Sequence, residues 1–123
     1  MTVTKASLGI GDLHFSNSPA RRHTKKQLRK AVHLFAKQGI ISPIVVDRSY
    51  RIINGHLRVM ASRELGIETR DALILPDISD AQRIELELAL IRLPEDSTWD
   101  AANLKIKIEQ LIEYNVRSNL HRI

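Results

Sequence analysis

The sequence predicts an α/β domain in which a small mixed β-sheet carries helices packed on it. Short runs of β-branched residues alternate with segments whose apolar residues recur at helical spacing, and glycines or prolines separate them. A chain of 123 residues is long enough for one hydrophobic core and too short for two comfortable domains. The expected order of elements is β-α-β-β-α-β-α-α, which is typical of a compact α/β fold.

The first third of the chain is expected to form a strand and a helix. The strand is predicted near residues 8–15, and a loop over residues 16–23 follows it. Thr24 and Gln27 make a capping-box pattern, which predicts a helix over residues 25–38. The apolar stripe of that helix consists of Leu28, Ala31, Val32 and Phe35.

Two β-prone runs, residues 41–47 and 50–53, are expected to pair as a hairpin. Arg48 and Ser49 lie between them, and neither residue type favours the two positive φ angles that a two-residue hairpin turn requires. The sequence therefore predicts a turn longer than two residues.

A helix directly after the hairpin is predicted to begin at His56, and Gly66 is placed to end it. Gly55 precedes this helix and Arg58 lies in its first turn. The N–H groups of a helix N-terminus, the positive end of the helix dipole and a nearby arginine can together hold an anion. We therefore interpret the turn from Gly55 to Arg58 as a candidate anion-binding site.

The remaining elements are one strand and two helices. The strand is predicted over residues 70–77, and Ser79 with Gln82 gives a second capping-box pattern for a helix over residues 80–93. The last helix, near residues 99–114, is amphipathic and is expected to cover the core, with a dimer seam as the alternative. A frayed polar tail is expected after it. We accordingly divide the chain into a domain over 1–100 and a C-terminal helix with its tail over 101–123.

The charge is distributed unevenly along the chain. Residues 20–63 contain eleven Lys and Arg against one acid, Asp47, whereas residues 64–114 contain five against twelve acids. This asymmetry indicates a basic end that could meet nucleic acid, and the alternative is a solvated helix face. The candidate nucleic-acid-binding residues are Arg21, Arg22, Lys25, Lys26, Arg29 and Lys30.

Several classes of function are excluded or disfavoured by composition. The chain contains no cysteine, which excludes disulfides, thiol catalysis and thiolate zinc sites. An apolar share of 43% and a charged share of 27% are those of an ordinary globular protein, so no disordered or fibrous class is expected. No segment is apolar enough for a signal peptide or a membrane span, so we expect a cytoplasmic protein without a membrane partner.

Three segments of the chain resemble one known family. "GIISPIVVD", "YRIINGHLRVMASRELG" and "DISDAQRIELELALIRL" are similar to successive segments of the ParB N-terminal domain, of the ParB/sulfiredoxin superfamily. "ARRHTKKQL", "NGHLR" and "EDSTWD" more narrowly resemble the ParB-like nuclease domains at the front of phage and bacterial DNA methyltransferases. The resemblance spans roughly residues 8–100 and implies the small α/β fold predicted above.

The resemblance also implies a ligand. In the family, the glycine-arginine turn holds nucleotide phosphates, which are those of CTP in partition proteins, and other members are nucleases, kinases or ATPases. Gly55 and Arg58 match the family glycine and arginine, and Arg21 and His23 fall in the loop that closes over the nucleotide. The alternatives are a glycine chosen only for its turn conformation, an exposed arginine and a generally basic loop.

His56 occupies a variable position of that turn. Sulfiredoxin has its reactive cysteine there, and this chain has no cysteine, so sulfiredoxin chemistry is excluded. His56 could contact phosphate or, as a catalytic residue, move a proton, although no carboxylate partner is evident in the sequence.

In the third segment, the acid and asparagine that bind metal in partition proteins are replaced by Leu90 and Ile91. Hydrocarbon side chains cannot hold Mg²⁺. The sequence therefore predicts no metal ligands at this position.

These observations support three hypotheses of function. The first is a ParB-like domain that binds nucleotide or nucleic-acid phosphates in partition, regulation or DNA modification, with DNA as a partner and CTP or ATP with Mg²⁺ as the cofactor, if any. The second is a metal-dependent nuclease or nucleotide hydrolase of the same fold. The third is a protein-interaction module with a vestigial phosphate site, which forms a homodimer through the last helix. A plasmid, phage or bacterial context is expected in each case.

Overall fold

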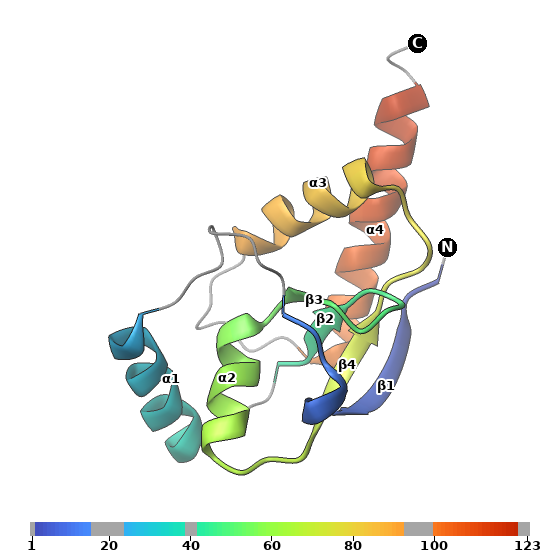
Figure 1. The fold of residues 1–123 in the computed structure, drawn as a ribbon. Helices are drawn as coiled ribbons and strands as arrows, with labels where there is room; N and C mark the ends of the chain where they lie inside the picture. The colour runs from blue at the N-terminus through green and yellow to red at the C-terminus, as the bar shows by residue number, and fades with distance from the viewer. Residues whose placement is uncertain (1, 16–23, 39–41, 93–99, 121–123) are drawn as a thin grey trace.

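The computed structural model describes residues 2–15, 24–38, 42–92 and 100–120 (Figure 1). The elements are β1 (Thr4–Gly9), η1 (Ile10–Asp12), α1 (Lys25–Gln38), β2 (Ile44–Val46), β3 (Ile52–Asn54), α2 (His56–Glu64), β4 (Thr69–Ile74), α3 (Asp80–Ile91) and α4 (Ala101–Leu120). The predicted order is confirmed, with the short 3₁₀-helix η1 added.

The four strands form one mixed sheet in the order β1-β4-β2-β3. β4 lies in its interior, antiparallel to β1 and parallel to β2, and β3 pairs antiparallel with β2. The predicted fold class, a small mixed sheet with helices packed on it, is confirmed.

Side chains that alternate along the strands build two hydrophobic clusters, one on each face of the sheet. Val45, Ile53 and Leu73 lie in a cluster with residues of α3 and α4. Ile44 and Ile52 lie in the other cluster, which contains residues of η1 and α2. This alternation is what the period of two in a strand requires when both faces are covered. α1 packs on α2 rather than on the sheet (Figure 1).

The turn between β2 and β3 is longer than two residues, as predicted. The N–H of Tyr50 donates to the Asp47 carbonyl at 3.0 Å, and Asp47 Oδ1 accepts from the N–H groups of Ser49 and Arg51, both at 2.9 Å. Tyr50 has φ 63°, the left-handed conformation that ends a three-residue hairpin loop. The Asp47 carboxylate thus holds a turn for which neither central residue type has a strong preference.

The first strand lies earlier in the chain than predicted. It was expected near residues 8–15, whereas β1 covers Thr4–Gly9 and is followed by η1. The register Thr4↔Ile74 to Gly9↔Thr69 places β1 at an edge of the sheet, with Thr4, Lys5 and Ser7 exposed. An edge strand with exposed polar residues has little hydrophobic signal, so its bounds depend on pairing with β4.

The last helix begins later and ends later than predicted. Asp100 caps it, because its Oδ1 accepts the N–H of Asn103 at 2.7 Å, and the helix then continues to Leu120 through the expected polar tail. Leu104, Ile108 and Ile112 are buried in the core, which confirms the expectation that this helix covers it. α3 ends at Ile91, close to the predicted limit.

Removal of the Ile108 side chain beyond Cβ should destabilise the domain, because Ile108 is completely buried between α4 and the sheet. We expect Ile108→Ala to lower the free energy of unfolding by about 2–5 kcal/mol in urea titrations followed by circular dichroism. Ile106→Ala is the matched control, since Ile106 is 54% exposed on the same helix. Equal losses in the two variants would contradict the packing of α4 described above.

Candidate functional site

Gly55 joins β3 to α2 in a conformation that requires glycine. Its φ is 101° and its ψ is 22°, which L side chains rarely adopt. A Cβ atom at this position would lie 2.9 Å from Ile44 Cγ2 and 3.2 Å from Nη2 of Arg58. The turn from Asn54 to Arg58, called the glycine turn below, therefore needs this glycine whether or not it binds a ligand.

Arg58 bends back over the glycine turn. It is half-buried, and its Nη2 donates to Asn54 Oδ1 at 3.0 Å. The Ser62 hydroxyl, one turn further along α2, donates to the Arg58 carbonyl at 2.7 Å. Arg58 is thus a positioned guanidinium at the start of a helix and differs from the exposed charge considered as an alternative.

The N-terminus of α2 differs from those of two other helices. α1 begins with a capping box, in which Gln27 N–H donates to Thr24 Oγ1 at 3.1 Å and Thr24 N–H donates to Gln27 Oε1 at 2.8 Å. α3 begins with the equivalent pair of Ser79 and Gln82, so both predicted capping boxes are confirmed. α2 has Gly55 as its N-cap and no side-chain cap. Its first N–H groups are thus not bonded by a capping side chain, as an anion site at a helix N-terminus requires.

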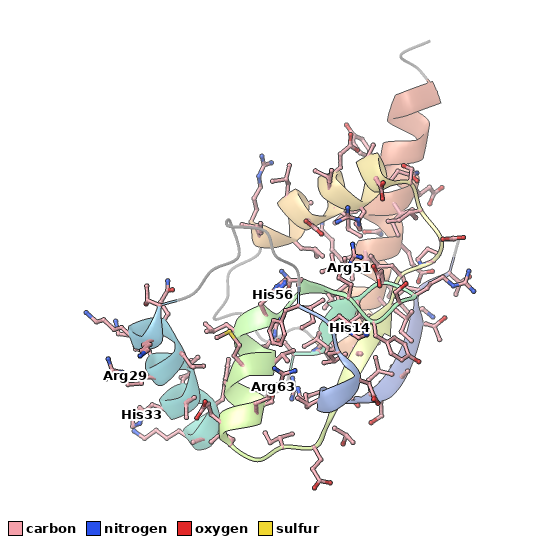
Figure 2. All side chains as sticks on the ribbon, viewed as in Figure 1. His14, Arg29, His33, Arg51, His56 and Arg63 are labelled. Atoms are coloured by element: carbon pink, nitrogen blue, oxygen red, sulfur yellow. The ribbon has the colours of Figure 1, made fainter. Side chains whose placement is uncertain are left out.

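His56 lies at the first position of α2 and is 5% exposed (Figure 2). The ring of Phe15 lies beside it, with 6.2 Å between the ring centroids. The guanidinium of Arg63 lies 4.6 Å above the same Phe15 ring. A proton transfer by His56 would require a substrate to approach an almost enclosed imidazole.

Two contacts were not predicted from the sequence, one within the glycine turn and one elsewhere in the sheet. Asn54 holds Arg58, and Arg70 on β4 donates through Nη2 to the Ser42 carbonyl at 2.6 Å. Burial lowers the pKa of Arg70, and the charge of the neighbouring Asp71 opposes that shift. The bond ties β4 to the segment before β2. Neither partner could be identified from the sequence, because one contact depends on a side-chain orientation and the other joins residues distant in the chain.

In α3, which contains the third segment of the family resemblance, the side chains of Leu90 and Ile91 carry no oxygen atom that could bind a metal ion. Leu90 is 2% exposed within the core, and Ile91 lies on the exposed side of α3. The nearby carboxylate of Glu87 pairs with Arg83 at 2.9 Å. Among the residues that the structure describes, no group of three or more His, Cys, Asp or Glu could hold a metal ion.

The predicted basic residues fall into two groups. Arg21, Arg22 and His23 lie outside the described residues. The others, Lys25, Lys26, Arg29 and Lys30, are all exposed on α1. The structure therefore brings Gly55, His56 and Arg58 together at one turn and places the described basic residues on a neighbouring helix. No helix in the described part of the chain is long and apolar enough to cross a membrane.

The mixed sheet and the glycine turn define an α/β domain of the ParB/sulfiredoxin class. The fold is similar to ParB from Caulobacter crescentus, solved in complex with CTP-gamma-S, with a TM-score of 0.66 and 20% identity over 76% of this chain and 56% of that one. It is also similar to a Pnob8-like ParB-N domain, with a TM-score of 0.63 and 17% identity over 98% of this chain and 48% of that one. The chain thus spans about half the length of these two proteins.

More distant structures share the same fold. A free serine kinase in complex with AMP matches with a TM-score of 0.53 and 20% identity over 65% of this chain and 34% of that one. Sulfiredoxin from Arabidopsis thaliana matches with a TM-score of 0.55 and 18% identity over 69% of this chain and 97% of that one. At these identities the likeness shows the fold.

Sequence comparison identifies the family. Residues 3–91 match the model of the ParB N-terminal domain. The ParB-like nuclease domain-containing protein YnaK of Escherichia coli (strain K12) is 31% identical over 64 residues, which are 52% of this chain and 74% of YnaK. The chain belongs to the ParB N-terminal domain family, which confirms the resemblance found in the three segments.

Substitution of Gly55 should destabilise the domain more than substitution of Gly66, which also has a positive φ. Gly55→Ala introduces both an unfavourable φ and a 2.9 Å contact with Ile44. We expect a loss of about 2–4 kcal/mol in the free energy of unfolding, measured by urea titration. The matched control, Gly66→Ala, has φ 72° and no neighbouring atom within 4 Å, so it should lose about 1–2 kcal/mol. A smaller loss at Gly55 than at Gly66 would contradict the close approach.

Proposed function

We propose that this chain is a ParB-like module that binds the phosphates of a nucleotide at the glycine turn, in a DNA transaction in the cytoplasm of a bacterium or on its phage or plasmid DNA. Gly55, His56 and Arg58 form the site, and the family resemblance adds Arg21 and His23, which lie outside the described residues. The observation that carries the proposal is the position of Arg58, which Asn54 holds over the helix N-terminus at 3.0 Å. The arrangement supplies a guanidinium beside a helix N-terminus whose N-cap, Gly55, has no side chain.

Each part of the turn has a separate task in this proposal. Gly55 adopts the positive φ from which α2 begins, and its missing Cβ leaves room for the Ile44 and Arg58 side chains to pack against the turn. The N–H groups at the start of α2 donate to the phosphate oxygens, and the helix dipole favours their negative charge. Arg58 donates through the planar fork of its guanidinium, which suits phosphate geometry. His56 contributes a contact from the enclosed side of the turn.

The relatives support a nucleotide as the ligand. ParB of Caulobacter crescentus was solved with CTP-gamma-S, and the free serine kinase was solved with AMP. CTP and ATP are accordingly the first candidates. The side chains of Leu90 and Ile91 carry no oxygen atoms, so in this proposal phosphate oxygens and water hold any Mg²⁺ that accompanies the nucleotide. We propose binding without hydrolysis.

DNA is the proposed macromolecular partner. Lys26, Arg29 and Lys30 of α1, together with Arg21 and Arg22, would contact the phosphate backbone without reading base sequence. Dimerisation through α4 is less well supported, because the apolar residues Leu104, Ile108 and Ile112 are already buried in the core of the same chain.

Calorimetric titration of CTP, ATP, GTP and UTP, each with Mg²⁺, tests the phosphate site. We expect one nucleotide to bind the wild type and binding to fall at least tenfold in Arg58→Ala, which corresponds to about 1.4 kcal/mol. Arg58→Lys should recover part of this loss, because it retains the charge without the planar fork. Arg92→Ala is the control, since it removes an exposed arginine from the end of α3. If none of the four nucleotides binds, the glycine turn is only structural.

The nuclease hypothesis rests on the similarity to YnaK, whose name describes a ParB-like nuclease domain. The proposal made here predicts no cleavage of plasmid DNA with Mg²⁺ or Mn²⁺, because the described residues offer no carboxylate cluster at the turn. Agarose gel analysis of supercoiled plasmid checks this outcome. Metal-dependent nicking that disappears in His56→Ala, but persists in His14→Ala, would overturn the binding-only function and support the nuclease.

A further inference from the structure

The outer face of α1 is basic along the whole helix. At about 100° per residue, its basic residues other than Lys25 fall on a stripe about 100° wide. This cationic stripe consists of Lys26, Arg29, Lys30, His33 and Lys37, all exposed. The apolar residues of α1 are centred on the opposite side, where the helix packs on α2. Figure 2 shows Arg29 and His33 projecting from the side of α1 away from α2.

An open depression lies along the stripe from Arg29 to Lys37. The basic residues of the stripe from Arg29 onward line this depression together with Leu34, which is 41% exposed. A ligand seated there would contact basic side chains from two successive turns of the helix. The stripe therefore extends past Lys30, the last residue of the basic segment Arg21–Lys30 that the sequence indicates.

The charge pattern of α1 opposes the stability of the helix itself. Lys25 and Lys26 lie in the first turn, where the helix dipole disfavours positive charge, and the first turn contains no acidic residue. Lys26 and Lys30 are a like-charge pair at i and i+4. Among the described residues, no ion pair involves α1. A bound polyanion would relieve this repulsion.

We propose that the cationic stripe is the surface that binds the sugar-phosphate backbone of double-stranded DNA, independently of base sequence. The inference rests on the DNA-binding part of the proposed function and names its surface, which includes His33 and Lys37 and excludes Lys25. Phe35 is half-buried and lies outside the stripe, so the stripe contains no Phe, Tyr or Trp on which single-stranded bases would stack. A membrane is disfavoured because the apolar face of the helix is already packed.

Fluorescence anisotropy with a labelled duplex, titrated at several salt concentrations, tests the surface with lysine-to-alanine variants of one helix. Lys26→Ala and Lys37→Ala should each weaken binding several-fold and make the slope of log K against log salt shallower by about 0.9, as one lost phosphate contact does. Lys25→Ala should change neither, and Lys5→Ala removes the same charge from β1 as a second control. Equal effects at Lys25 and Lys26, or none at Lys37, would overturn the stripe.

Lys26→Glu separates binding from folding. A carboxylate in the first turn interacts favourably with the helix dipole, so the thermal unfolding temperature of Lys26→Glu should equal or exceed that of the wild type. Its affinity for the duplex should be lower than that of Lys26→Ala. Weaker binding accompanied by a lower unfolding temperature would overturn this interpretation, as would tighter binding to single strands or anionic vesicles than to duplex.

Duplex binding by Arg58→Ala without nucleotide should equal that of the wild type, so failure of the phosphate site and failure of the stripe are distinguishable. No duplex binding by the wild type at low salt would overturn both the stripe and the proposed DNA partner.

Discussion

The left-handed backbone at Gly55 is the constraint on which the rest of the site depends. Gly55 is the single residue between β3 and α2, and its conformation brings the turn against the side chain of Ile44 on the adjacent strand β2. Because the helix begins there, Val59 on its next turn enters the same hydrophobic cluster as Ile44. Arg58 in turn reaches Asn54 only because both residues flank this glycine. The geometry needed to hold an anion therefore follows from how one helix is joined to one strand.

The two faces of the sheet have different consequences for function. On one face, α3 and α4 complete a cluster with Val45, Ile53 and Leu73 and contribute mainly stability. The opposite face carries α2, and α1 is attached to the molecule chiefly through α2. The glycine turn and the cationic stripe thus belong to neighbouring helices, α2 and α1, that pack against each other (Figure 1). Because α2, α3 and α4 complete the two hydrophobic clusters, the solvent-exposed face of α1 is not needed for the core and can carry the cationic stripe.

Local interactions could be predicted from the sequence and distant ones could not. The capping pair Thr24 and Gln27 sets the start of α1 by contacts three residues apart, and the helix was predicted with its observed bounds. The positive φ of Gly66 at the end of α2 likewise follows from residue type. The position of β1 depends on its pairing with β4 about 65 residues later, which short-range patterns do not encode. The bond from Arg70 to Ser42 is equally non-local, and an arginine in a strand gives no sign of its partner.

Binding of phosphate and hydrolysis of phosphate make different demands on this fold. The N–H groups at the start of α2 and the Arg58 guanidinium come from one turn, so they are assembled as soon as α2 docks on the sheet. Metal-assisted hydrolysis needs oxygen ligands from another element as well. In this chain, Leu90 on α3 is 2% exposed and belongs to the cluster that α3 and α4 share with the sheet. A carboxylate there would be buried among hydrocarbon, with a large desolvation penalty. The packing of α3 and α4 therefore excludes a metal ligand at Leu90, whereas the phosphate binding that we propose depends on α2, which packs on the opposite face of the sheet.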